Sequence, residues 1–226
     1  VGLFASALGS RAAVIAHCGA QTTADTVTLA AAAGEDGADA VAVIAPPYFR
    51  LDDRAQLAHL AAAAEAAAPL PFYVYEFAAA SGYPVPVPVL EALRKRAPNL
   101  AGLKVSDTPW DAFAAYLVEG LDVFVGPESL IGRGIPAGAV GAVSALASAF
   151  PEQVVAAVRD PGGAAAVSLG RLRERVETFP RHAALKRVAA RRGVPLREDV
   201  RPPLRPLTED ERRELDAWLG EDGAAA

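Results

Sequence analysis

The sequence predicts an α/β protein of the TIM (β/α)8 barrel class, incomplete at the N-terminus, with six strands present and helices at the C-terminal end. Strand-like and helix-like segments alternate at roughly 25 to 30 residues per unit. The strand-like segments are continuously apolar, which is typical of parallel strands buried on both faces. Polar residues fall at their carboxyl ends, where parallel α/β folds carry their sites. No G-x-G-x-x-G follows a strand, which weakens the alternative of a doubly wound dinucleotide-binding sheet.

The elements of the barrel region follow from apolar runs and from the residues that interrupt them. An initial helix ends at Gly9, a second helix ends at Gly34, and Pro46 stops the second strand. Strands are expected at 12–16, 39–45, 71–77, 99–105, 122–126 and 140–147. Helices are expected at 1–8, 22–33, 52–68, 88–97, 109–118 and 128–137, with a loop at 78–83.

The pattern becomes purely helical after Phe150. Helices are expected at 151–158, 164–192 and 208–219, and the last begins with a capping box, Thr208-x-x-Glu211. We therefore divide the chain into a partial (β/α)8 barrel over residues 1–160 and a C-terminal helical region over residues 161–226.

A closed barrel of this class needs eight strands, and six are counted here. The chain starts with Val1, contains no methionine, and opens on what resembles the tail of a helix. An open six-stranded barrel would also expose two unpaired strand edges. We therefore expect about two βα units to precede residue 1, and six consecutive strands with a gap where two more belong.

The amino-acid composition argues against several classes of binding partner. The net charge of −5 argues against nucleic acid as the main partner. No apolar run approaches the ~20 residues that a membrane-spanning helix needs, and no charged segment followed by a cleavable apolar run suggests secretion. The single cysteine, Cys18, excludes an internal disulfide and suits a reducing cytoplasm. The prediction is a cytoplasmic protein that binds neither nucleic acid nor membrane.

One of the three lysines stands apart. Lys95 and Lys186 lie on Arg-rich helices, where their ammonium groups can remain in water, whereas Lys104 lies in a strand between Leu103 and Val105. Apolar surroundings lower the pKa of a lysine, and a neutral amine is a nucleophile toward carbonyl groups. The alternative is a lysine at a strand end whose ammonium group reaches solvent.

Tyr75 ends the strand before the one that carries Lys104. On neighbouring parallel strands, both side chains can point into one barrel mouth. The amine could attack a keto group while the phenol moves protons. The alternative for Tyr75 is a packed aromatic side chain with its hydroxyl bonded elsewhere.

Two stretches carry a resemblance to a known family. Residues 72–82, FYVYEFAAASG, and residues 101–107, AGLKVSD, resemble the two signature regions of the dihydrodipicolinate synthase / N-acetylneuraminate lyase family. Residues 13–19, 45–48 and 138–144 resemble further family segments, in the same order. The family comprises class I, pyruvate-type aldolases on a (β/α)8 barrel with extra C-terminal helices.

The resemblance implies a role for each matching residue. Lys104 would form the Schiff base, Tyr75 would relay protons, and Tyr48 would complete the relay in a neighbouring subunit. The implied substrate-binding residues are Val143, Gly141 and Ser81. The implied substrate is a small 2-keto acid such as pyruvate, with no cofactor or metal, and the implied assembly is a homodimer or homotetramer.

The chain also departs from the family pattern. The usual Tyr-Asn-x-Pro is replaced by YEFA at 75–78, and Ala80 lies where dihydrodipicolinate synthases carry an arginine for the second substrate's carboxylate. This puts the lysine-pathway reaction in doubt. The family segment that holds the pyruvyl carboxylate is expected before residue 1.

Other interpretations remain open. The chain could be a non-catalytic or truncated family member with a ligand-binding or assembly role, or a barrel that binds phosphate at its glycine-rich 132–141 segment. His17, Cys18 and Glu76 could be imagined as metal ligands, but no His-x-His or Cys-x-x-Cys spacing supports this. His59 and His182 are expected on helix surfaces.

Overall fold

The computed structural model describes residues 1–221 and divides into two compact units. The first unit comprises Val1–Pro127 and Ala137–Gly141, and the second comprises Glu128–Pro136 and the chain from Ala142 onward. The predicted domain boundary after residue 160 stays a prediction.

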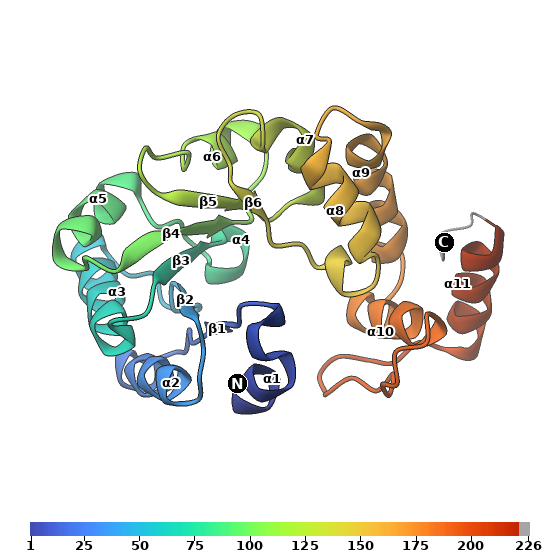
Figure 1. Cartoon of the computed structure of the whole chain (residues 1–226), viewed down its shortest axis with the longest axis horizontal. Helices are drawn as coiled ribbons and strands as arrows, with labels where there is room; N and C mark the ends of the chain where they lie inside the picture. Colours follow the sequence, from blue (N-terminus) through green and yellow to red (C-terminus); the bar gives the residue numbers. More distant parts are fainter. Residues whose placement is uncertain (222–226) are drawn as a thin grey trace. The chain divides into compact units, whose positions relative to one another are not determined.

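Within the described residues, six strands form one sheet whose spatial order follows the sequence, β1 to β6 (Figure 1). The strand pairs from β1 to β5 are parallel, as the barrel class requires. The prediction of six strands in a (β/α)8-type arrangement is therefore confirmed. The strands are β1 (Ile15–His17), β2 (Ala40–Ile44), β3 (Phe72–Glu76), β4 (Leu100–Val105), β5 (Asp122–Val125) and β6 (Gly141–Ala142).

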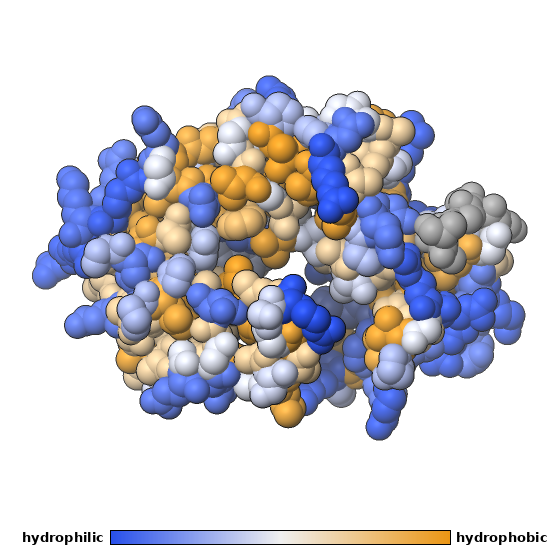
Figure 2. Space-filling view, in the orientation of Figure 1, coloured by the Kyte–Doolittle hydropathy of each residue, from blue (hydrophilic) through white to orange (hydrophobic). Residues whose placement is uncertain are grey.

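Helices connect the strands, and local capping explains where two of them begin. The side chain of Thr22 accepts a hydrogen bond from the backbone N–H of Asp25, and Asp52 caps the next helix in the same way at Ala55. Figure 2 shows hydrophilic side chains over the outward side of α3 and α5. The helices of this unit are α1 (Gly2–Leu8), α2 (Thr23–Glu35), α3 (Asp53–Ala67), α4 (Ala78–Ser81), α5 (Val87–Arg96) and α6 (Trp110–Ala114).

The two faces of the sheet differ in burial. Along β2, β3 and β5, buried residues alternate with half-exposed or exposed ones, because successive side chains point to opposite faces. Helices α2 and α3 pack on β2, and α3 also packs on β3, so the buried set faces the helices. The prediction that both faces are fully buried was wrong, since only one face is covered in this way. The buried set includes Val41, Val43, Phe72, Val74, Glu76, Leu103, Val105, Val123 and Val125.

The strand register places four side chains in one row across the half-exposed face. Ile44 pairs with Tyr75, Tyr75 with Lys104, and Lys104 with Phe124. One row earlier lies Gly102, where a Cβ atom would be only 2.0 Å from the carbonyl oxygen of Asp122. Any side chain there would separate β4 from β5, so this glycine sets the spacing of the row.

The second unit is helical. Its elements are η2 (Glu128–Leu130), α7 (Ile131–Gly134), η3 (Leu146–Ser148), α8 (Pro151–Arg159), α9 (Ala164–Glu177), α10 (Arg181–Arg191) and α11 (Glu209–Glu221). Its core includes Phe150, Leu169 and Leu215, all fully buried. Three helices were predicted at the C-terminal end. Within the described residues there are four, α8 to α11, because the second predicted helix is divided into α9 and α10.

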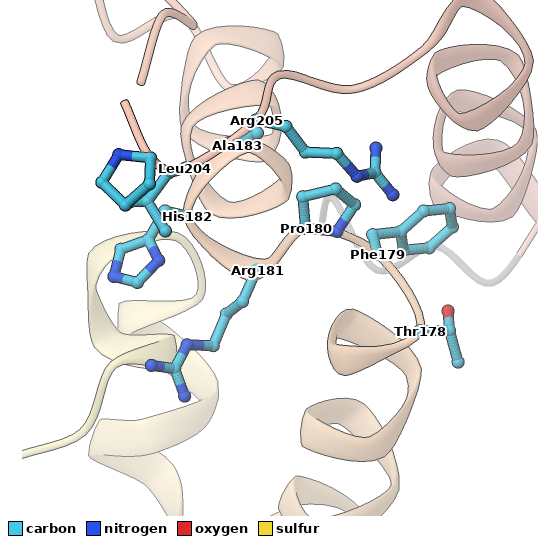
Figure 3. A pocket seen from close by; sticks show the side chains of 9 residues that line it. Thr178, Phe179, Pro180, Arg181, His182, Ala183, Leu204 and Arg205 are labelled. Atoms are coloured by element: carbon cyan, nitrogen blue, oxygen red, sulfur yellow. The ribbon is translucent and has the colours of Figure 1, made fainter. Parts of the chain in front are cut away.

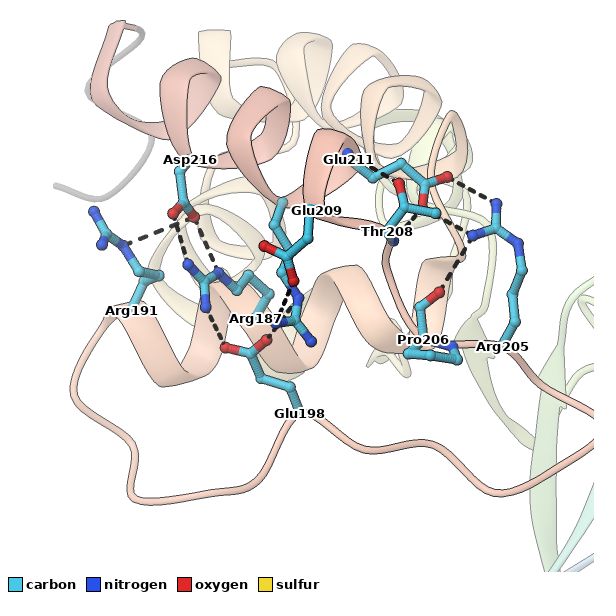
Figure 4. A network of polar contacts seen from close by, with 10 residues as sticks. Arg187, Arg191, Glu198, Arg205, Pro206, Thr208, Glu209, Glu211 and Asp216 are labelled. Carbon is cyan, nitrogen blue, oxygen red and sulfur yellow. Dashed lines mark hydrogen bonds and ion pairs between the residues drawn. The ribbon is translucent and has the colours of Figure 1, made fainter.

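Polar contacts fix α10 and α11. Arg187 forms ion pairs with Glu198 and with Asp216, each at 2.6 Å (Figure 4). The predicted capping box is confirmed, because the Thr208 N–H donates to Glu211 and the Glu211 N–H donates back to the Thr208 hydroxyl. These contacts connect α10, the segment after it and α11.

Several predicted boundaries were wrong. The strand expected at 140–147 has only two residues and is followed by a 3-10 turn, and the helix expected at 109–118 ends at Ala114. The helix expected at 128–137 is a 3-10 turn plus one short helix. The helix expected at 164–192 is interrupted at Pro180, because proline lacks the N–H that a helix interior needs.

His59 was also predicted wrongly. It is buried on α3, and its Nδ1 lies 2.9 Å from the hydroxyl of Thr23 on α2. Burial lowers the pKa of this imidazole, because the charged form loses hydration. The alanine-rich sequence of α3 hid the distinction, since alanine fits a buried or an exposed helix face equally well.

Candidate functional site

Tyr75 and Lys104 lie side by side at the carboxyl ends of β3 and β4. They are register partners, and both are half-buried on the face opposite α3. The Lys104 nitrogen lies 3.8 Å from the centroid of the Tyr75 ring and 5.9 Å from that of Phe77. It also forms a close contact with the Ser106 hydroxyl. An amine, a phenol and a hydroxyl thus meet on one open face, a set suited to carbonyl chemistry.

The Tyr75 ring is the centre of an aromatic cluster. The His17 ring meets it edge-on at 5.8 Å, and the Phe77 ring stacks on it at 6.1 Å. The pKa of His17 is lowered, first by partial burial and second by the positive charge of Lys104. His17 is therefore neutral near pH 7 and can accept or donate a hydrogen bond beside the tyrosine.

Glu76 follows Tyr75 and points to the opposite, helix-covered face, where it is 1% exposed. Its Oε2 accepts a hydrogen bond of 2.8 Å from the Val85 N–H. Burial, and then the neighbouring Asp107 carboxyl, raise the pKa of Glu76 to about 8. This carboxyl is consequently protonated at neutral pH.

The other predicted site residues lie in different settings. Tyr48 is 86% exposed, has a positive φ of 88°, and meets the Phe49 ring edge-on at 4.7 Å. Gly141 is buried, and a Cβ atom there would lie 3.2 Å from the Phe124 ring. The Ser81 hydroxyl is buried and donates to the Tyr83 carbonyl at 2.6 Å. Val143, in the second unit, is 47% exposed.

Sequence reasoning missed two neighbours of Lys104. Ser106 was not singled out, although residues two apart in a strand share a face. His17 was considered only as a metal ligand, whereas here its ring contacts Tyr75. Glu76 points to the other face, which separates it from His17. Within residues 1–221, no group of three or more His, Cys, Asp or Glu side chains is arranged to hold a metal ion.

A pocket of about 450 Å³ in the second unit is lined partly by cations (Figure 3). Arg181 bonds Glu177, and Arg205 bonds Glu211, so both guanidinium groups are already neutralised by carboxylates of this chain. No lysine amine lines this pocket, so it offers no group that could form an imine. In the described part of the chain, no helix has both the length and the apolar character needed to span a membrane.

The sequence profile of the Dihydrodipicolinate synthetase family matches residues 1–221. The chain belongs to this family. It is 34% identical over 230 residues to a DapA-like lyase of Halobacterium salinarum, covering 96% of this chain and 73% of that protein.

Solved structures agree on the fold of this dihydrodipicolinate synthetase family member. Dihydrodipicolinate synthase from Aquifex aeolicus superposes with a TM-score of 0.90 at 21% identity, covering 99% of this chain and 79% of that one. YagE, a prophage protein of the dihydrodipicolinic acid synthase family from E. coli K12 solved in complex with pyruvate, gives 0.88 at 20% identity. That match covers 97% of this chain and 78% of YagE.

Proposed function

We propose that this family member is a class I lyase, cleaving or forming a carbon–carbon or carbon–oxygen bond through an imine between Lys104 and a small 2-keto acid such as pyruvate. The observation that carries the proposal is the Lys104 nitrogen 3.8 Å from the Tyr75 ring, on the half-exposed face of β3 and β4. The pyruvate bound to YagE supports the choice of acid.

The proposed chemistry assigns a role to each neighbour. The neutral amine of Lys104 attacks the keto carbon, and the resulting carbinolamine loses water to give the imine. The Tyr75 hydroxyl supplies the proton that leaves with this water and later accepts one from the substrate methyl group. The Ser106 hydroxyl and neutral His17 stand beside this pair and can exchange protons with it.

The remaining predicted residues enter as proposals. Gly141, Val143 and Ser81 would bind the keto acid, the first two through their backbone. The methyl group of Ala80 cannot bind a carboxylate, so we propose a second substrate that is not held by a cation there. The single cysteine, Cys18, is buried and unpaired, and this supports the proposal of a cytoplasmic location.

Reductive trapping tests the imine. Treating the protein with pyruvate and borohydride should reduce the imine to an N-(1-carboxyethyl) adduct on Lys104, located by peptide mass mapping. Lys95 and Lys186 are the internal controls, because both are exposed. An adduct on either of them, or none with any 2-keto acid, would favour the alternative of a non-catalytic family member.

The Tyr75→Phe variant distinguishes the proposed role of Lys104 as nucleophile from the proposed role of Tyr75 as proton relay. It keeps the ring beneath Lys104 but removes the hydroxyl, so the adduct should still form while turnover falls by ~10²- to 10⁴-fold. Phe77→Leu is the matched control, since it changes the aromatic stack without removing a proton donor. Unchanged turnover in Tyr75→Phe would remove the phenol from the mechanism.

Tyr48 supports a further part of the proposal, self-association as a homodimer or homotetramer. An exposed aromatic pair of Tyr48 and Phe49, held with a backbone conformation unusual for tyrosine, is typical of a contact surface. We expect Tyr48→Asp to shift the protein toward monomer in analytical ultracentrifugation. A wild-type protein that is already monomeric at micromolar concentration would contradict this.

A further inference from the structure

We propose that Glu76 is a positioning residue, whose buried carboxyl fastens the segment 77–85 to the ends of β3 and β4 and so holds Tyr75 beneath Lys104. This inference rests on the proposed function. It assigns a role to a group on the face opposite the reacting side chains.

The first support is the set of contacts around the Glu76 carboxyl. The Val85 N–H donates to its Oε2 at 2.8 Å, and the Tyr116 hydroxyl donates to the Val85 carbonyl at 3.0 Å. Val85 lies nine residues after Glu76, and Tyr116 follows α6. The carboxyl therefore ties the end of β3 to the segment at Val85, which in turn bonds the segment after α6.

The second support is the matching contact at the end of β4. Oδ1 of Asp107 accepts a hydrogen bond of 2.8 Å from the Ala78 N–H, and the Ser106 N–H donates to the Glu76 carbonyl at 2.8 Å. Asp107 comes three residues after Lys104, and Ala78 comes three after Tyr75. The two strand ends are thus joined through the same short segment that starts α4.

The third support is the other oxygen of Glu76. Among the described residues, Oε1 is buried and makes no hydrogen bond of good geometry, while the Asp107 carboxyl and the Tyr116 hydroxyl are its side-chain neighbours. A proton on Oε1 could be donated to the Asp107 carboxylate, which would satisfy both groups. Without that proton, the buried carboxylate of Glu76 would face the carboxylate of the half-exposed Asp107.

The electrostatics agree with this geometry. Burial is the main cause that raises the pKa of Glu76 to about 8, and Asp107 adds to it. The titratable groups that face Glu76 are Asp107 and Tyr116. The pKa of Tyr116 is raised by burial and then by the charges of Glu76 and Asp107, so Tyr116 keeps its proton. Glu76 is the group whose charge changes in the mildly alkaline range.

The presence of glutamate at position 76, which departs from the family pattern, fits the proposed positioning role. The family pattern has asparagine after the tyrosine, and an amide both donates and accepts hydrogen bonds. A protonated carboxyl also does both, whereas a carboxylate only accepts. Ionisation of Glu76 would set a repulsion against Asp107, the acceptor of the Ala78 N–H, and the Tyr75 ring would lose its fixed place beneath Lys104. The bond from the Val85 N–H by itself favours the ionised form.

Exchange of the methyl hydrogens of pyruvate for deuterium, followed by NMR, tests the inference. This exchange needs only the imine and its enamine, so no second substrate is required. Glu76→Gln keeps a donor and an acceptor but carries no charge. The ratio of the Glu76→Gln rate to the wild-type rate should rise about tenfold per pH unit above pH ~8, because other titrating groups cancel in the ratio.

The control is Glu91→Gln, which removes an exposed carboxylate on α5 and should give a ratio independent of pH. A Glu76→Gln ratio that is also flat between pH 6 and 10, with both proteins active, would overturn the inference.

Hydrogen exchange of the backbone amides in 77–85, read by mass spectrometry, provides a measurement that needs no activity. Above pH ~8 the Ala78 amide and the α4 amides after it should lose protection in the wild type and keep it in Glu76→Gln. Equal protection at every pH would overturn the inference even in an inactive protein. Absence of pyruvate exchange in the wild type would contradict the proposed function alone.

Discussion

Replacing Lys104 with alanine is expected to abolish the exchange of the methyl hydrogens of pyruvate with solvent, a loss of ~10³-fold or more. The enamine that releases these hydrogens forms only after a covalent bond to the amine nitrogen. The nearby Tyr75 phenol and His17 imidazole can move protons but cannot replace that bond. NMR in deuterated buffer measures the loss directly.

Two further variants test whether the loss of exchange in Lys104→Ala is caused by the loss of the nucleophilic amine. Lys104→Arg keeps the positive charge near the Tyr75 ring but supplies no nucleophilic amine at neutral pH, so it should be as inactive as Lys104→Ala. Lys186→Ala removes an exposed lysine that bonds the Asp199 carbonyl, and it should retain full activity. Exchange that persists in Lys104→Arg would refute an imine at this residue.

Replacing Glu128 with alanine is expected to lower the free energy of unfolding by about 2 to 4 kcal/mol. Glu128 is 2% exposed and accepts from Arg173 at 2.9 Å through Oε2 and from the Ser144 hydroxyl at 2.7 Å through Oε1. The variant would leave the partly buried guanidinium of Arg173 and the Ser144 hydroxyl without this acceptor. Urea unfolding of the two proteins measures the difference.

The matched control is Glu177→Ala, which removes the other carboxylate bound to Arg173. The Glu177 side chain is 46% exposed, so its loss should lower stability by less than ~1 kcal/mol. If the two substitutions lowered the free energy of unfolding equally, the burial of Glu128 would not increase the contribution of its ion pair to stability.

Much of the fold was predictable because turn residues and apolar runs act locally. Thr22 and Asp52 start helices through their own side chains, and Gly9 ends one with a positive φ. The strand expected at 140–147 failed because a short run of small apolar residues fits a strand or an irregular turn equally well. The helix break at Pro180 is encoded locally by the proline, although strong helical patterns flank it on both sides.

The candidate site was predictable where it depended on strand order. Tyr75 and Lys104 end consecutive strands, and parallel pairing places them together. The environment of Glu76 could not be predicted from the sequence. It depends on the tertiary contacts that bring Val85, Asp107 and Tyr116 to the end of β3. The amino acid at 76 was visible as a departure from the family pattern, but its burial was not.

The placement of the three lysines has a spectroscopic consequence. Reductive methylation with ¹³C-formaldehyde would label the Lys95, Lys104 and Lys186 amines, and a two-dimensional carbon–proton spectrum would report on each of them. The Lys104 amine lies against the Tyr75 ring, whose ring current should shift the methyl resonance of this lysine. A titration of that resolved signal would report the protonation of a single amine in the intact protein.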